Sequence, residues 1–163
     1  MDLLTLTRRR LFALDLEATE KRAVLEELLD YLIDSGEVPN EARKDVLAAI
    51  LAREERLSTG MEGGVALPHG LTDAIAEEVA AVGIASHGVP FEALDGNPAR
   101  IIVLLLTPRS KVFRHVTNVC EIARVLRRPR VRERLLRSSA IDEVVGVLER
   151  AYAEDGDELQ DDR

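Results

Sequence analysis

A run of six consecutive apolar residues, Ile101 to Leu106, restricts the fold of this chain more than any other feature. A strand with one face in water alternates apolar and polar residues, whereas this run is apolar at every position. It therefore predicts a central strand that is covered on both faces. Thr107-Pro108 follows and is expected to close the strand, because proline has no N–H to donate to a neighbouring strand.

Helical patterns stand on both sides of this strand. Thr19 is a suitable N-cap for a helix whose apolar positions recur at helical spacing until Gly36, a favoured residue at a helix C-terminus. Pro39-Asn40 begins a second helix, with Arg53 in its last turn, where a cation suits the helix dipole. Three further helices are predicted after the strand: 110–128, 129–137, and one opened by a capping box of Ser139 and Asp142.

The segments between the helices predict additional strands. Residues 1–18 are expected to form an extended lead-in with one edge strand. Strands are predicted at 65–67 and 79–85, a helical turn at 72–78, and a hairpin turn at Ser86-His87-Gly88 that returns the chain along 89–94. Together these elements predict an α/β protein with a single three-layer domain, in which a mixed β-sheet is flanked by α-helices. The helix at 110–128 is expected to bury a stripe that includes Val112, Val116 and Cys120.

Charge and cysteine content restrict the class of protein. The formal net charge is −8, of which −5 lies in residues 154–163, so a domain of residues 1–153 followed by a disordered acidic tail is expected. An acidic domain argues against nucleic acid as a partner. A single cysteine, Cys120, and an N-terminus without a secretory signal fit a cytoplasmic protein. No apolar run is long enough for direct insertion into a membrane.

A glycine-rich segment delivers one histidine after a short apolar run. Gly60, Gly63 and Gly64 allow positive φ angles and a close approach of the backbone. Pro68 keeps the preceding residue extended, and His69 follows directly. An imidazole placed in this way can act as an acid, a base, a metal ligand or a nucleophile.

Most of the chemistry that such a histidine could perform does not fit the spacing of its neighbours. The glycines match neither nucleotide-binding loop pattern, and the G-x-S-x-G serine-hydrolase motif is absent. His69, His87, His115 and Cys120 include no close pair of metal ligands, so neither a metal nor a cofactor is predicted. A histidine with positive charge and hydrogen-bond donors nearby remains, which suits a phosphoryl group on an imidazole nitrogen.

The residues that supply this setting resemble a known signature. Arg53-Glu54, Ser58-Thr59-Gly60 and Gly64-Val-Ala-Leu-Pro-His-Gly70 occur in that order, followed by Pro90-Phe-Glu-Ala-Leu-Asp-Gly-Asn-Pro98 and the helix with His115. This arrangement resembles the enzyme IIA domains of the bacterial phosphoenolpyruvate:sugar phosphotransferase system, in the fructose, mannitol and nitrogen-regulatory class. The resemblance extends over nearly all of residues 1–150.

The resemblance implies a role for each residue. His69 would accept a phosphoryl group from the phosphohistidine of the carrier protein HPr or a paralogue. His115 would orient the phosphate, Arg53 would stabilise its charge, and Ser58, Thr59 and Gly60 would bind it. The recipient would be a transporter domain or a regulatory protein target.

Three functions remain open at this point. No attached transporter domain is visible in the sequence, and a free-standing protein of this class is expected to be a regulatory, nitrogen-type enzyme IIA. The alternatives are a sugar-specific enzyme IIA subunit that feeds a fructose- or mannitol-type transporter, and a binding module that is not phosphorylated. Leu71-Thr72-Asp73 stands where a basic residue is expected in nitrogen-regulatory members, which weakens that subgroup assignment.

Structural roles would also account for several of these residues. His69 could close a strand, His115 could lie on a helix surface, and Arg53 could simply cap its helix. Ser58-Thr59-Gly60 could be an ordinary turn. The arginines of residues 124–137 are expected to form a solvated face paired with nearby acids, or a docking surface for an acidic partner.

Overall fold

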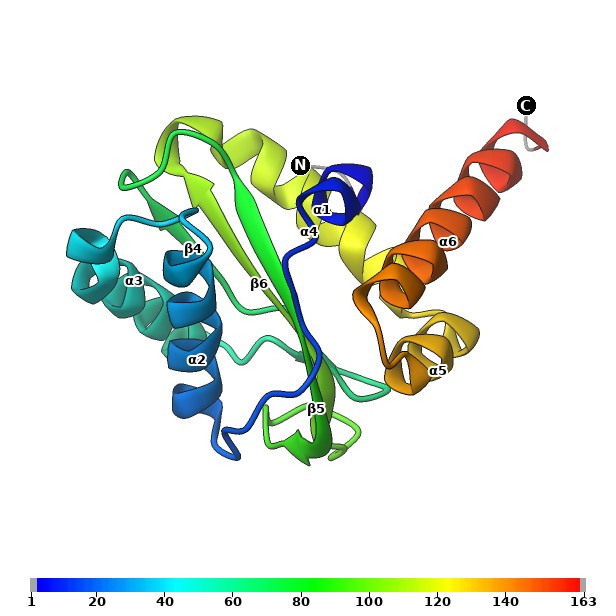
Figure 1. Ribbon diagram of the computed structural model, residues 1–163, viewed down its shortest axis with the longest axis horizontal. Helices are drawn as coiled ribbons and strands as arrows, with labels where there is room; N and C mark the ends of the chain where they lie inside the picture. Colours follow the sequence, from blue (N-terminus) through cyan, green and yellow to red (C-terminus); the bar gives the residue numbers. More distant parts are fainter. Residues whose placement is uncertain (1–2, 162–163) are drawn as a thin grey trace.

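A six-stranded mixed sheet forms the centre of the protein (Figure 1). The computed structural model describes residues 3–161, with side chains placed for residue 5 and residues 7–154. The order of strands is β1-β5-β6-β3-β2, and β4 also pairs with β6. The strands are β1 (Phe12–Ala13), β2 (Gly60–Met61), β3 (Val65–Ala66), β4 (His69–Thr72), β5 (Val79–Val89) and β6 (Ala99–Pro108).

Helices cover both faces of this sheet. In Figure 1, α2 and α3 lie on one side of the strands, and α4, α5 and α6 lie on the other. This arrangement confirms the predicted three-layer α/β architecture with a mixed sheet. The helices are α1 (Leu3–Arg9), α2 (Lys21–Asp34), α3 (Arg43–Arg56), α4 (Val112–Leu126), α5 (Pro129–Arg137) and α6 (Ile141–Asp161), with short 3₁₀ turns at Asn40–Ala42 and Arg109–Lys111.

The central strand β6 contributes to two separate hydrophobic cores. Ile102, Leu104 and Leu106 pack in the core formed with α2 and α3. Their neighbours at 101, 103 and 105 pack in the core formed with α4, α5 and α6. Since successive side chains of a strand point to opposite faces, an apolar residue is needed at every position, as the sequence predicts.

Strands β3 and β4 lie end to end along the same edge of β6. Val65 pairs with Ile101 and His69 pairs with Leu105, so both segments keep one register against β6. Pro68 interrupts the ladder between them, but its carbonyl still accepts a hydrogen bond from the Leu105 N–H at 2.9 Å. His69 therefore begins a strand in a fixed position, on the face that α4 covers.

Three local predictions are wrong. Residues 3–9 form the helix α1, which packs against α6, instead of an extended lead-in; the predicted edge strand is present as β1. Residues 73–78 form bends and no helical turn, because β4 continues to Thr72. The residues 86–88 do not form a hairpin turn. They belong to β5, at a register shift between Ile84 and Val89, and the strand pairs with β6 again at Val89.

The buried face of α4 also differs from the predicted stripe. Val112, Val116 and Cys120 are exposed. The helix is instead rotated so that its buried positions include two polar residues, His115 and Asn118. A local apolar pattern could not reveal this rotation, since it depends on buried polar partners from the sheet that are described below.

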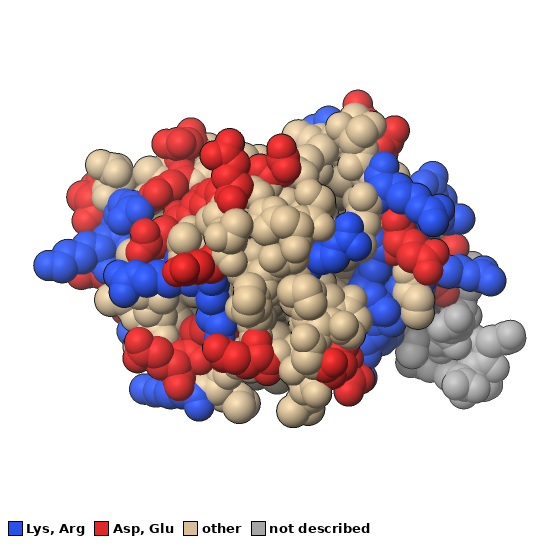
Figure 2. Space-filling model, turned by 90° about the horizontal axis from the view of Figure 1, so that it is seen from below, with Lys and Arg blue, Asp and Glu red and all other residues tan. Residues whose placement is uncertain are grey.

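The last helix begins close to the predicted position. Glu143, and not Asp142, completes the cap, because its carboxylate accepts the Ser139 N–H at 2.7 Å. α6 continues as helix to Asp161, through most of the segment predicted to be disordered; residues 162 and 163 lie outside the described residues. Figure 2 shows basic side chains gathered toward the end of the molecule where α5 and α6 lie. Within residues 3–161, no helix is long and apolar enough to cross a membrane.

Candidate functional site

The ring of His69 is oriented by its own backbone. Its Nδ1 lies 2.8 Å from the carbonyl oxygen of Leu67. Because a carbonyl oxygen can only accept a hydrogen bond, Nδ1 carries the proton in the neutral ring and Nε2 keeps a lone pair. Burial lowers the pKa of His69; the hydrogen bond to Leu67 opposes this effect and the charge of Arg53 adds to it. The neutral, nucleophilic ring is thereby favoured at neutral pH.

His115 approaches His69 from α4, the helix that covers this face of the sheet. The centroids of the two rings lie 4.8 Å apart, with their planes tilted by 57°. The Nδ1 atom of His115 lies 2.9 Å from the Oγ1 of Thr107, at the end of β6. Burial lowers the pKa of His115, the nearby His69 lowers it further, and Glu78 opposes both effects. The structure thus brings together the two histidines that the sequence singles out.

A pocket of about 340 Å³ opens over this pair. Three arginines line it together with the two imidazoles, and none of its lining residues is a carboxylate. The guanidinium of Arg53 is held by the Leu57 carbonyl, which accepts a hydrogen bond from Nη1 at 2.9 Å. Such a lining suits an anionic group next to an imidazole. The lining residues are Ala49, Ala52, Arg53, Arg56, His69, Gly70, Leu71, Arg109 and His115.

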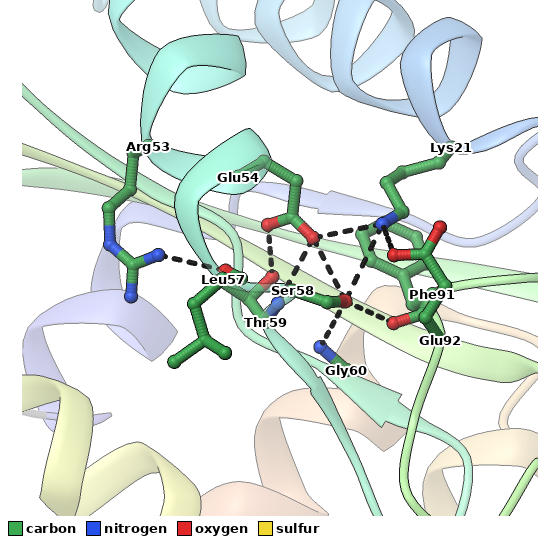
Figure 3. Close-up of polar contacts among 9 residues, drawn as sticks. All are labelled: Lys21, Arg53, Glu54, Leu57, Ser58, Thr59, Gly60, Phe91 and Glu92. Carbon is green, nitrogen blue, oxygen red and sulfur yellow. Dashed lines mark hydrogen bonds and ion pairs between the residues drawn. The ribbon is translucent and has the colours of Figure 1, made fainter.

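Ser58 and Thr59 are engaged with other groups, away from this pocket (Figure 3). The carboxylate of Glu54 accepts the Thr59 N–H at 3.0 Å and the Thr59 hydroxyl at 2.6 Å. The hydroxyl of Ser58 contacts Glu54 and the carbonyl oxygen of Phe91. These contacts fix the loop after α3, and therefore also the Leu57 carbonyl that holds Arg53.

Gly60 also lies outside the pocket over the two histidines. A Cβ atom at this position would collide with the carbonyl oxygen of Phe91, so the loop requires a glycine there. The structure therefore does not bring Ser58, Thr59 and Gly60 together with His69 and His115 in one pocket.

Several residues of the site were not among the sequence-based candidates. Arg109 supplies a guanidinium from the turn that follows β6, and it pairs with Asp73 at 3.5 Å. Glu78 and Thr107 support His115 from inside the protein. Glu54 belongs to the Arg53-Glu54 pair of the signature, so the sequence did indicate this residue. Glu78 and Thr107 had no local signal, because only the packing of α4 on the sheet brings them to His115.

Metal binding has no support in the described side chains. No group of three or more histidine, cysteine or acidic residues in that part of the chain could hold a metal ion.

The fold and this pocket define an α/β domain that holds two partly buried imidazoles beside a cluster of three arginines. The chain belongs to the family described as phosphoenolpyruvate-dependent sugar phosphotransferase system, EIIA 2, whose model matches residues 5–151. Members of this family are components of a phosphotransferase system, so a role in phosphoryl transfer follows from membership.

The relatives of this chain include both sugar-specific components and nitrogen regulatory proteins. A fructose-specific EIIA component from Haloferax volcanii is 32% identical over 147 residues, which cover 90% of this chain and 94% of that protein. The nitrogen regulatory protein IIA-Ntr from Neisseria meningitidis has a similar structure, with a TM-score of 0.76 and 29% identity over 86% of this chain and 94% of that one.

A further solved structure has the same fold and contains a partner. It is the complex of the mannitol enzyme IIA with phosphorylated mannitol enzyme IIB from Escherichia coli. Its TM-score is 0.72, with 22% identity over 86% of this chain and 94% of that chain. At this identity the likeness concerns the fold alone.

Proposed function

We propose that this protein is a phosphocarrier that accepts a phosphoryl group on Nε2 of His69. The observation that carries the proposal is the hydrogen bond from Nδ1 to the Leu67 carbonyl, which leaves Nε2 unprotonated beside a pocket lined by three arginines. The lowered pKa of His69 supports it, because a protonated ring has no lone pair with which to attack.

The donor would be a phosphohistidine on a small carrier protein such as HPr. The lone pair of Nε2 forms a bond to phosphorus while the P–N bond of the donor breaks, and the donor imidazole recovers that electron pair. The donor ring leaves as a neutral imidazole because its other nitrogen carries a proton. Nδ1 of His69 likewise keeps its proton throughout, so no proton has to move between the two rings. The chemistry then demands in-line positioning and stabilisation of the charge on the transferred group.

The residues around His69 can meet these demands. Arg53, held by the Leu57 carbonyl, would stabilise the phosphoryl oxygens, and Arg109 lies in the same pocket. His115 would orient the group without carrying it. Ser58, Thr59 and Gly60 would contribute indirectly, since their contacts fix the loop that carries Leu57.

Accurate mass measurement and ³¹P NMR test this proposal. The wild-type chain is incubated with phosphoenolpyruvate, enzyme I and HPr, in parallel with His69→Ala and His87→Ala variants. His87 is a matched control because it is exposed and lies on β5, where its Nε2 contacts the Ala18 carbonyl. We expect one acid-labile phosphoryl group on the wild type and on His87→Ala, and none on His69→Ala. If the wild type gains no phosphoryl group with any donor, the third function, a binding module that is not phosphorylated, would be favoured.

The recipient of the phosphoryl group distinguishes the two remaining roles. A regulatory, nitrogen-type role has support from the similarity to IIA-Ntr, and a sugar-specific role from the similarity to the fructose component. Leu71 lines the pocket where a basic residue is expected in nitrogen-type members, which favours the sugar-specific branch. Rapid transfer of label from phosphorylated protein to a fructose- or mannitol-type enzyme IIB would establish that branch, and its absence would favour regulation.

A further inference from the structure

Glu78 and Thr107 form a polar pair inside the otherwise apolar interior behind His115. The Glu78 side chain belongs to a residue that is only 6% exposed, and Thr107 is completely buried. The Thr107 hydroxyl lies 2.5 Å from Oε1 of Glu78, and the side-chain amide of Asn118 donates to Oε2. A buried carboxylate is costly unless its oxygens accept hydrogen bonds, so this cluster requires an explanation.

The chemistry of the three groups fixes the direction of each hydrogen bond. A hydroxyl has one proton, and the Thr107 proton is donated to the carboxylate of Glu78. The oxygen of Thr107 must then accept its contact with His115, so Nδ1 of that ring is the donor, over 2.9 Å. The carboxylate thereby selects the tautomer of His115 through one intervening hydroxyl.

We propose that Glu78 is a positioning residue for the phosphoryl transfer proposed above, and that it acts through Thr107 on His115. It holds the proton of the neutral ring on Nδ1, which leaves Nε2 as the nitrogen available to the group on His69. When a phosphoryl group arrives there, Nε2 of His115 takes up a proton from water. The resulting imidazolium donates a hydrogen bond to a phosphoryl oxygen, and Glu78 compensates its charge from behind.

The charges that face His115 support a ring that is neutral before the phosphoryl group arrives and protonated afterwards. Arg53 on α3 and Arg109 after β6 line the same pocket, and His69 on β4 contacts the ring directly. Burial together with the charges of His69 and Arg53 disfavours the protonated ring, while Glu78, the residue before β5, favours it. A phosphoryl group adds negative charge on the same side as the arginines, so the balance shifts toward the imidazolium.

Ring ¹⁵N NMR of the unphosphorylated full chain tests the first step. We expect the wild-type His115 to be the Nδ1–H tautomer, although free histidine in water prefers Nε2–H. Thr107→Val removes the acceptor while keeping the shape of the side chain, so the Nε2–H tautomer should appear. Thr107→Ser keeps the hydroxyl and should retain the wild-type spectrum. An unchanged tautomer in Thr107→Val would overturn the inference.

The pH profile of phosphoryl transfer tests the second step. Glu78→Gln removes the charge behind His115 and should lower the pKa of that ring in the phosphorylated protein by about one unit, which is about a tenfold loss of the protonated form above its pKa. The alkaline limb of the pH–rate profile, where the rate falls as His115 loses its proton, should shift to lower pH accordingly. Glu77→Gln is the matched control, since Glu77 is exposed and pairs with Lys111. A Glu78→Gln profile that coincides with the wild type would overturn the inference, even if Thr107→Val does not fold.

The two proposals fail in different ways. A wild-type protein that accepts no phosphoryl group would overturn the proposed function, and with it the purpose assigned to Glu78. Normal acceptance by the wild type, combined with an unchanged tautomer and an unchanged pH profile in the variants, would overturn the role of Glu78 alone.

Discussion

Gly70 of β4 packs directly against Ile50 of α3. A Cβ atom at residue 70 would stand 3.3 Å from the Cγ1 of Ile50 and 3.5 Å from its backbone nitrogen. This contact determines how closely the helix lies on the strand. Arg53 follows Ile50 by about one helical turn, and His69 precedes Gly70, so the same contact sets the separation of the Arg53 and His69 side chains.

Gly70→Ala is therefore expected to reduce both stability and phosphoryl acceptance. The added methyl group overpacks the contact, which should cost about 1–3 kcal/mol in the free energy of unfolding. Displacement of α3 should slow acceptance by roughly 10- to 100-fold, because small misplacements of a functional group are costly. Denaturant unfolding and the initial rate of phosphorylation measure the two effects.

Gly146→Ala is the matched control for this substitution. Gly146 lies in α6, and a Cβ atom there would meet nothing closer than 3.7 Å. Alanine in a helix interior should raise stability by roughly 0.5–1 kcal/mol and leave the phosphorylation rate unchanged. Equal rates for the Gly70→Ala protein and the wild type would show that the contact with Ile50 does not position Arg53.

The central elements of the fold could be predicted from sequence because their determinants are local. Six apolar residues in succession define a strand buried on both faces, and Pro129 marks the start of α5. The rotation of α4 could not be predicted in this way. Val112 and Val116 fit an apolar stripe, yet the helix buries His115 and Asn118, because Thr107 and Glu78 offer them hydrogen bonds within the protein.

The candidate residues of the site also divide into those with a local sequence signal and those that only folding brings together. His69 and Arg53 stand in a contiguous signature, so their sequence neighbours indicate them. Arg109 and Glu78 lie on segments that meet the pocket only after folding. Ser58 and Thr59 belong to the signature as well, but their hydroxyls are used by Glu54. A signature identifies which residues matter without distinguishing contact with the phosphate from support of the loop.

The two histidines should make stability depend on pH just below about 6.5. The pKa values of His69 and His115 are both lowered in the folded protein, mainly by burial. Below the unfolded value of about 6.5, the unfolded chain binds protons that the folded chain resists, so the free energy of unfolding falls as pH falls. Each histidine contributes a slope of at most about 1.4 kcal/mol per pH unit.

Chemical denaturation at several pH values measures this dependence. The slope just below about pH 6.5 should decrease in His69→Gln and in His115→Gln. The carboxyl groups with lowered pKa values, Asp30, Glu77 and Asp95, titrate below this window and should not obscure it. A free energy of unfolding that rises on acidification through this window would contradict the prediction.

Glu54→Ala should destabilise the protein more strongly than any surface substitution nearby. The carboxylate is buried, accepts the Thr59 N–H and hydroxyl, and pairs with Lys21 at 3.2 Å (Figure 3). Its removal leaves the buried N–H and hydroxyl of Thr59 without their acceptor, while Lys21 keeps its ion pair with Glu92, and should cost about 2–5 kcal/mol. The loop should also loosen, and Arg53 with it, so the rate of phosphorylation should fall.

Glu55→Ala provides the comparison one residue further along the helix. Glu55 is exposed, and its replacement should change the free energy of unfolding by no more than about 0.5 kcal/mol. Thermal and denaturant unfolding of both variants measure the difference. Similar stabilities for the two proteins would mean that the Glu54 cluster does not hold the loop.

Phe113 on the first turn of α4 should serve contact with the donor protein and not the stability of the fold. Its side chain is 91% exposed, and Val116 one turn later is 62% exposed. Solvent-exposed apolar groups beside the pocket over His69 and His115 are typical of a docking surface, where an aromatic residue that becomes buried on binding contributes much of the affinity. Phe113→Ser should therefore raise the KM for the phosphorylated donor about tenfold, with kcat and the melting temperature nearly unchanged.

Leu94 offers the matched control for Phe113, because it is 96% exposed and lies in the loop before β6, outside the pocket over His69. Leu94→Ser should leave both kinetic constants unchanged. If exposure of any apolar side chain were sufficient to affect transfer, the two variants would behave alike, and the assignment of the donor surface to α4 would fail. A lower kcat with an unchanged KM in Phe113→Ser would instead mean that Phe113 acts on His115, two residues away on the same helix, and not on the partner.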